Sequence, residues 1–96
     1  MRRRRLIRRD ANALLHQHIS DMALHHLISM ANDIGGFFAT MPDHEEAVSA
    51  MTQHLRNFWE PRMRHEIIAY AHDGGADLIP FAREAIARLD VERKLA

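Results

Sequence analysis

Prolines and paired glycines divide the chain beyond residue 20 into four segments, and within each segment apolar residues recur at intervals of three and four. That interval places apolar side chains along one face of an α-helix. No stretch alternates apolar and polar residues in the manner of a half-buried strand. The sequence therefore predicts an all-α fold, a compact bundle of four short helices.

The first two helices have recognisable ends. The first is expected from about Ser20 to Phe38, and Gly35-Gly36 within it indicates either close approach of a neighbouring backbone or a loosened helix end. Asp43 and Glu46 have the spacing of an N-terminal capping box, which predicts that the second helix begins there. The expected apolar stripes are Leu24, Leu27, Ile28, Ala31, Ile34 and Phe38, followed by Val48, Met51, Leu55 and Phe58.

The last two helices are bounded by proline and glycine. Pro61 suits the first position of a third helix, because it has no backbone N–H to leave unpaired. Gly74-Gly75 predicts its end, since glycine readily adopts left-handed backbone. Asp77 is expected to cap the fourth helix, with Pro80 at an early position. Their stripes are Met63, Ile67, Tyr70 and Ala71, then Leu78, Phe81, Ala85, Ile86 and Leu89.

The length of 96 residues is sufficient for one domain and too short for two. Residues 1–18 contain six arginines and lack apolar periodicity, which favours a basic, flexible N-terminal extension. Residues 19–96 are expected to form a single helical domain. The net charge is zero, so the body beyond the arginines is acidic.

The absence of cysteine excludes disulfides, iron–sulfur ligation and thiol nucleophiles in this chain. No window approaches the roughly 20 apolar residues of a membrane-spanning helix. The arginine-rich start is not followed by an apolar stretch of signal-peptide length. We therefore expect a protein that neither spans a membrane nor is secreted, and a reducing cytoplasm is compatible with this composition.

The eight histidines do not have the spacing of a metal site. His25 and His26 are adjacent and would point about 100° apart on a helix, whereas ligands on one helix converge at spacings of three or four. Asp21 and His25 form the only well-spaced pair in that region. His16 with His18 would suit a strand, and His65 lies seven positions from His72. Solvated or interface histidines are the favoured interpretation, with no metal and no other cofactor.

No catalytic constellation is apparent. Serine and threonine lie in helical or capping contexts without a neighbouring base. Glu45-Glu46 is explained by the favourable interaction of carboxylates with a helix N-terminus. A domain this small rarely encloses a substrate pocket as well as a core. The chain is not expected to be an enzyme by itself.

The segment between the second and third helices is the strongest candidate for a binding surface. It combines the only tryptophan with a proline and two arginines. The aromatic residues have a simpler explanation as core, and the two interpretations carry similar weight. Trp, Met and Arg are frequent in interface hot spots, and guanidinium groups pair with partner carboxylates. The candidate protein-interface residues are Phe58, Trp59, Pro61, Arg62, Met63 and Arg64.

Apolar residues also exceed what one thin core requires, which indicates association with a partner or with further copies of the chain. The arginine arm could contact nucleic acid or another polyanion without sequence specificity. However, the acidic body and the lack of a basic recognition helix make nucleic acid an unfavoured partner.

Three runs resemble a known family: Met30 to Phe38, with Asn32-Asp33-Ile34-Gly35-Gly36 at its centre; His54 to Arg64; and Ile67 to Ala71 before Gly74-Gly75. Over about residues 20 to 90 the chain resembles the delta subunit of NAD-dependent, molybdenum-containing formate dehydrogenases. These are helix-packing residues and not a catalytic signature. Residues 1–18 depart from the short N-terminus usual in that family.

The resemblance implies a non-catalytic accessory subunit, or an assembly or maturation factor, of a cytoplasmic formate dehydrogenase complex. The larger subunits would be its partners and would hold the molybdopterin, iron–sulfur clusters and flavin. The alternative is a free-standing helical adaptor that binds an acidic partner or nucleic acid through its arginine arm.

Overall fold

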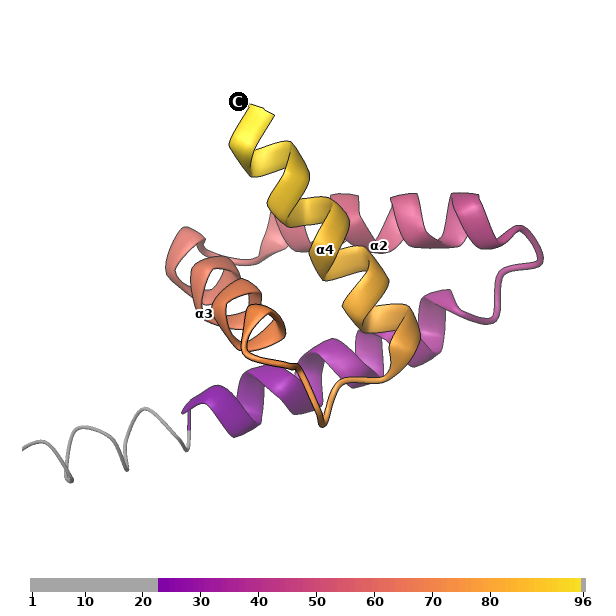
Figure 1. The fold of residues 1–96 in the computed structure, drawn as a ribbon. Helices are drawn as coiled ribbons and strands as arrows, with labels where there is room; N and C mark the ends of the chain where they lie inside the picture. The colour runs from indigo at the N-terminus through magenta and orange to yellow at the C-terminus, as the bar shows by residue number, and fades with distance from the viewer. Residues whose placement is uncertain (1–22, 96) are drawn as a thin grey trace, which may run out of the picture.

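The computed structural model describes residues 23–95. Within that range the chain forms four helices and no strand (Figure 1), which confirms the predicted all-α fold. The first helix is described over residues 23–38 and is followed by α2 (His44–Phe58), α3 (Pro61–His72) and α4 (Pro80–Leu95). The arginine-rich extension and the expected start of the first helix near Ser20 lie outside the described residues.

The helix α2 begins where the sequence predicts. The carboxylate of Asp43 accepts a hydrogen bond of 3.0 Å from the backbone N–H of Glu46. Glu45 and Glu46 lie in the first turn, where carboxylates stabilise the unpaired N–H groups. Pro61 occupies the first turn of α3, which confirms its predicted role as a helix start.

The end of α3 is also as predicted. Gly74 and Gly75 have φ angles of 110° and 54°, a backbone conformation that side-chain-bearing residues rarely adopt. The N–H of Gly75 donates to the carbonyl of Tyr70, closing the last turn. The left-handed backbone of these two residues therefore ends α3 and turns the chain toward α4.

The predicted capping role of Asp77 is wrong. Its carboxylate accepts a hydrogen bond from the Tyr70 hydroxyl, and α4 begins three residues later, at Pro80. The side-chain amide of Asn32, from the first helix, binds the backbone just before α4 instead. Its oxygen accepts a hydrogen bond from the N–H of Ile79, and its nitrogen donates to the carbonyl of Asp77, both at 2.9 Å. A residue distant in sequence therefore satisfies the loop's polar groups.

The core lies where α4 packs against the other helices; Figure 1 shows α4 passing over α2, with α3 to one side. Among the labelled helices the main contacts are those of α4 with α2 and with α3. Apolar side chains of all four helices meet there, so the separate stripes become one cluster. The fully or almost fully buried members include Ala31, Val48, Met51, Leu55, Ile67, Ala82, Ala85 and Ile86.

The two glycines of the first helix have different surroundings. A Cβ atom at Gly35 would lie 3.1 Å from Ile79 Cδ1 and 3.3 Å from Ala82 Cβ, whereas one at Gly36 would meet nothing within 4 Å. Of the two interpretations that the sequence left open, close backbone approach therefore applies to Gly35.

Phe58 does not belong to the apolar stripe of α2, contrary to the sequence prediction. It is 74% exposed, whereas its neighbour Trp59 is 4% exposed. Trp59 lies four residues beyond Leu55 and continues the buried face, while its extended backbone, with ψ of 136°, ends the helix. The indole therefore fills the core position assigned to Phe58.

Polar contacts connect the outer faces of the helices. The ion pairs Glu45–Arg88 and Arg56–Glu92 join α2 to α4. Hydrogen bonds join His44 of α2 to Glu84 and His72 of α3 to Asp90. Within residues 23–95, no helix is long and apolar enough to cross a membrane.

Candidate functional site

The junction of α2 and α3 is held from both sides by candidate interface residues. Trp59 packs in the core below it. The Arg64 guanidinium reaches back from α3, and its Nη1 donates to the carbonyls of Arg56 and Trp59 at 2.7 and 2.9 Å. Carbonyls in the last turn of a helix have no partner within the helix, so Arg64 satisfies two of them. Trp59 and Arg64 therefore fix the geometry of the junction.

The remaining predicted interface residues are more accessible. Phe58 and Pro61 are exposed, and Met63 is partly buried against the core. The Arg62 side chain is 89% exposed and lies 3.7 Å from Glu66, a loose pair one turn further along α3. Because an exposed pair of this kind contributes little stability, the Arg62 guanidinium remains available to a partner.

Phe58 continues a surface that the sequence did not reveal. Four rings follow one another across the first helix and α2, with centroid separations of 5.3, 5.8 and 4.9 Å. The two end members, Phe37 and Phe58, are 71% and 74% exposed. We call this surface the aromatic row; its members in order are Phe37, Phe38, His54 and Phe58.

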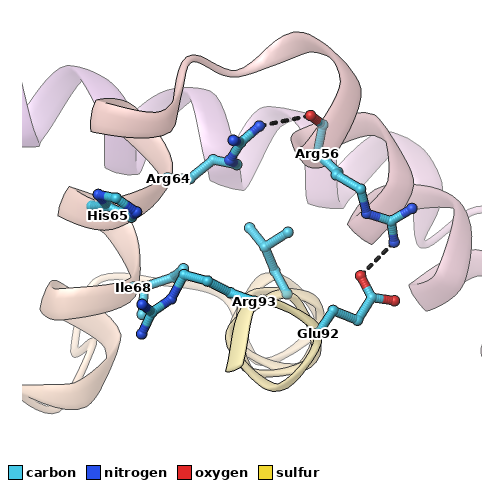
Figure 2. A pocket seen from close by; sticks show the side chains of 7 residues that line it. Arg56, Arg64, His65, Ile68, Glu92 and Arg93 are labelled. Atoms are coloured by element: carbon cyan, nitrogen blue, oxygen red, sulfur yellow. Dashed lines mark hydrogen bonds and ion pairs between the residues drawn. The ribbon is translucent and has the colours of Figure 1, made fainter. Parts of the chain in front are cut away.

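A basic hollow of about 540 Å³ lies on another side of the junction, between the end of α2, the start of α3 and the end of α4. Figure 2 shows Arg56, Arg64, His65 and Arg93 around it, contributed by three helices. Ile68 and Leu89 provide apolar surface, and Glu92 is the carboxylate among the lining residues.

Each arginine of the basic hollow is held by a neighbour. Arg56 pairs with Glu92, Arg64 binds the two carbonyls of the junction, and Arg93 lies 2.9 Å from Asp90. Asp90 is 6% exposed. Its pKa is lowered to about 2, first by the hydrogen bond with His72 and next by that with Arg93. The cations around the hollow are thus anchored to the fold.

The histidines are dispersed over the described residues. Within residues 23–95, no three His, Cys, Asp or Glu side chains come together in a way that could hold a metal ion. His44 and His72 pair with carboxylates, His54 belongs to the aromatic row, and His65 borders the hollow. His16, His18 and the Asp21 of the Asp21–His25 pair lie outside the described residues.

Of the residues that line the hollow, only Arg64 is among the interface residues predicted from the sequence. Arg56, His65, Glu92 and Arg93 are charged residues at ordinary helix positions, and only the crossing of α4 brings them together. The aromatic row was missed because Phe38 and Phe58 were assigned to buried stripes. The separation of four residues between His54 and Phe58, which places both on one face of α2, was the one local signal for the aromatic row.

Comparison with known protein families places the chain in context. The family model described as NADH-dependent formate dehydrogenase delta subunit FdsD matches residues 26–86, which is more than half of the chain. Neither the curated proteins nor the solved structures contain a match. The matched range includes the aromatic row, the α2–α3 junction and the start of α4.

Proposed function

Because the chain belongs to the family of NADH-dependent formate dehydrogenase delta subunits, we propose that it is a non-catalytic accessory subunit or assembly factor of such an enzyme. It acts by contact with the larger subunits, and the contact surface comprises the aromatic row and the exposed side of the α2–α3 junction. A cytoplasmic location of the complex is part of the same proposal.

The exposure of the aromatic row is the observation that carries this proposal. Two phenylalanines, Phe37 and Phe58, are more than two-thirds exposed although the chain has a well-formed core. Contiguous aromatic surface of this kind is characteristic of protein interfaces, where aromatic side chains supply much of the binding energy. Its burial against a larger subunit would remove both rings from water.

Charge at the junction adds specificity to that contact. The Arg62 guanidinium is exposed and only loosely paired with Glu66, so it can form a bidentate pair with a partner carboxylate. Arg64 has a structural role in the contact. Its hydrogen bonds to the carbonyls of Arg56 and Trp59 position Phe58 and Pro61 at the surface. Trp59 and Met63 support the contact surface from beneath.

The side chains that line the basic hollow and the lack of cysteine in the sequence favour a non-catalytic role. Most ionisable groups of the basic hollow are engaged in structural pairs, and no serine or threonine belongs to its lining. The chain has no cysteine with which to hold an iron–sulfur cluster. Redox chemistry in the complex is therefore assigned to the larger subunits.

The proposal is tested by expressing the larger formate dehydrogenase subunits with and without this chain. The readouts are co-purification, molybdenum content and formate-dependent NAD reduction. Stable co-purification identifies a structural subunit. A loss of metal or activity in the absence of the chain, without co-purification, identifies an assembly factor. No effect on any readout refutes the proposal and favours the free-standing adaptor.

Three altered chains locate the contact. Phe58→Ser with Arg62→Ala removes the exposed side chains of the junction and is expected to weaken co-purification. Val91→Ser, which removes an exposed apolar side chain from α4, is the matched control. Deletion of residues 1–9 tests the alternative, because loss of binding on that deletion would place the contact in the arginine arm. Size-exclusion chromatography of the chain alone reports any homo-oligomer.

A further inference from the structure

We propose that the basic hollow binds a phosphate-bearing small molecule of nucleotide size, independently of the protein contact described above. Three guanidinium groups and the His65 imidazole border the hollow, against one carboxylate, that of Glu92. Two of these guanidinium groups are paired with carboxylates, Arg56 with Glu92 and Arg93 with Asp90, which lies outside the lining. Arg64 therefore gives the group an excess of one positive charge, which favours an anionic ligand.

The cations are preorganised, which lowers the entropic cost of binding. Arg56, Arg64 and Arg93 are each fixed by a hydrogen bond to Glu92, to backbone carbonyls or to Asp90. A guanidinium has five N–H groups, and these bonds engage only part of them. The remaining donors are presented from a fixed framework and do not have to be ordered by the ligand.

The shape of the hollow favours a compact ligand with an apolar part. Its volume of about 540 Å³ lies within the range of small-molecule pockets. Figure 2 shows Arg64 and Arg93 on opposite sides of the space, so the cations can bind phosphate groups at separate points. Ile68 and Leu89 supply apolar surface for a base or similar ring, on which guanidinium planes can also stack.

A phosphate ligand fits this lining better than an acidic peptide segment does. Arg56 and Arg93 each have one carboxylate partner, Glu92 and Asp90, and a peptide carboxylate would bring only one negative charge and two oxygens to the donors that remain. A phosphate group carries more charge and three oxygen acceptors, and it can therefore bridge donors that approach from different helices.

Binding is measured with the full chain by methyl NMR of Ile68 and Leu89 and by calorimetry, using ATP, tripolyphosphate, adenosine and an oligoglutamate peptide. We expect saturable shifts of both methyl signals with ATP, weaker binding of tripolyphosphate and no binding of adenosine. Arg93→Gln is expected to weaken ATP binding about tenfold, the effect of losing one charge-assisted hydrogen bond. His65→Ala is expected to weaken it further.

The control is Arg62→Gln, which removes an exposed arginine from α3 outside the hollow and is expected to leave ATP affinity unchanged. An ATP affinity that is unchanged in the double variant Arg93→Gln/His65→Ala shows that ATP binds at another surface, such as the arginine arm, and overturns the proposal. Binding of oligoglutamate in preference to ATP also overturns it. Because Arg62 belongs to the proposed subunit contact and Arg93 does not, co-purification with the larger subunits is tested separately from ATP binding.

Discussion

The side chain of Asn32 and the backbone of Ile79, 47 positions apart, are joined by a hydrogen bond of 2.9 Å. The same amide donates to the carbonyl of Asp77, so one residue of the first helix binds two backbone groups of the turn that precedes α4, this carbonyl and the N–H of Ile79. The methyl end of Ile79 lies against Gly35, one helical turn further along. This pairing positions the first helix on the remainder of the domain.

Replacement of Asn32 by alanine is expected to destabilise the domain by about 1–2 kcal/mol, because two hydrogen bonds are lost and a partly buried N–H is left without its partner. Urea denaturation followed by circular dichroism measures the change. Asn32→Asp keeps the acceptor and is expected to cost less. Asn57→Ala, on the exposed face of α2, is the control and is expected to lie within about 0.5 kcal/mol of the parent.

The two adjacent glycines give opposite predictions. Gly36→Ala is expected to stabilise the domain by about 0.5–1 kcal/mol, because the new methyl group enters open space and alanine favours the helix. Gly35→Ala is expected to destabilise it by about 1 kcal/mol or more, because the methyl group would press on Ile79 and Ala82. Equal melting temperatures of the two variants would contradict the close approach at Gly35.

Acid is expected to remove the stabilisation that Asp90 contributes. The pKa of its carboxyl is about 2 in the folded chain and about 4 in an unfolded one, so the folded state favours the charged form. That stabilisation is complete above about pH 4 and is lost as the pH falls toward 2. Unfolding free energies of the parent and of Asp90→Asn, measured from pH 6 to pH 2, are expected to converge at the acid end. A difference in unfolding free energy that stays constant from pH 6 to pH 2 would contradict the lowered pKa of Asp90.

Neighbouring aromatic residues at the junction are expected to separate stability from association. Trp59→Ala removes a buried indole and is expected to cost about 3–5 kcal/mol. Phe58→Ala removes an exposed ring and is expected to leave the melting temperature almost unchanged while it weakens co-purification with the larger subunits. Loss of stability on Phe58→Ala, or unaltered co-purification, would count against the aromatic row as a contact surface.

Local signals allowed much of the fold to be predicted. Asp43, Pro61 and Gly74-Gly75 mark helix ends through interactions within a few residues, so the sequence alone placed α2 and α3 correctly. Asp77 was assigned wrongly because its competitor, Asn32, approaches from another helix. Whether Phe58 or Trp59 is buried depends on where α2 ends, because neighbouring residues of a helix point about 100° apart and only one of the two can continue the buried face.

The candidate site was less accessible to sequence reasoning. The corner from Phe58 to Arg64 was recognised from its unusual composition, but the division of that corner into supporting and exposed side chains required the structure. Arg64 looked like a free cation because its acceptors are backbone carbonyls, which have no signature in a sequence. Likewise, Arg56 and Arg93 are 37 positions apart in the chain and border the same hollow only because α4 packs against α2 and α3.

The packing of α4 against both α2 and α3 also determines how the domain comes apart. If α4 separates, the buried faces of both helices are exposed at once, Met51 and Leu55 on one and Ile67 and Ile68 on the other. Unfolding is therefore expected to be a single cooperative transition without a stable partly folded remnant. A molecule that binds to α4 consequently raises the melting temperature of the entire domain.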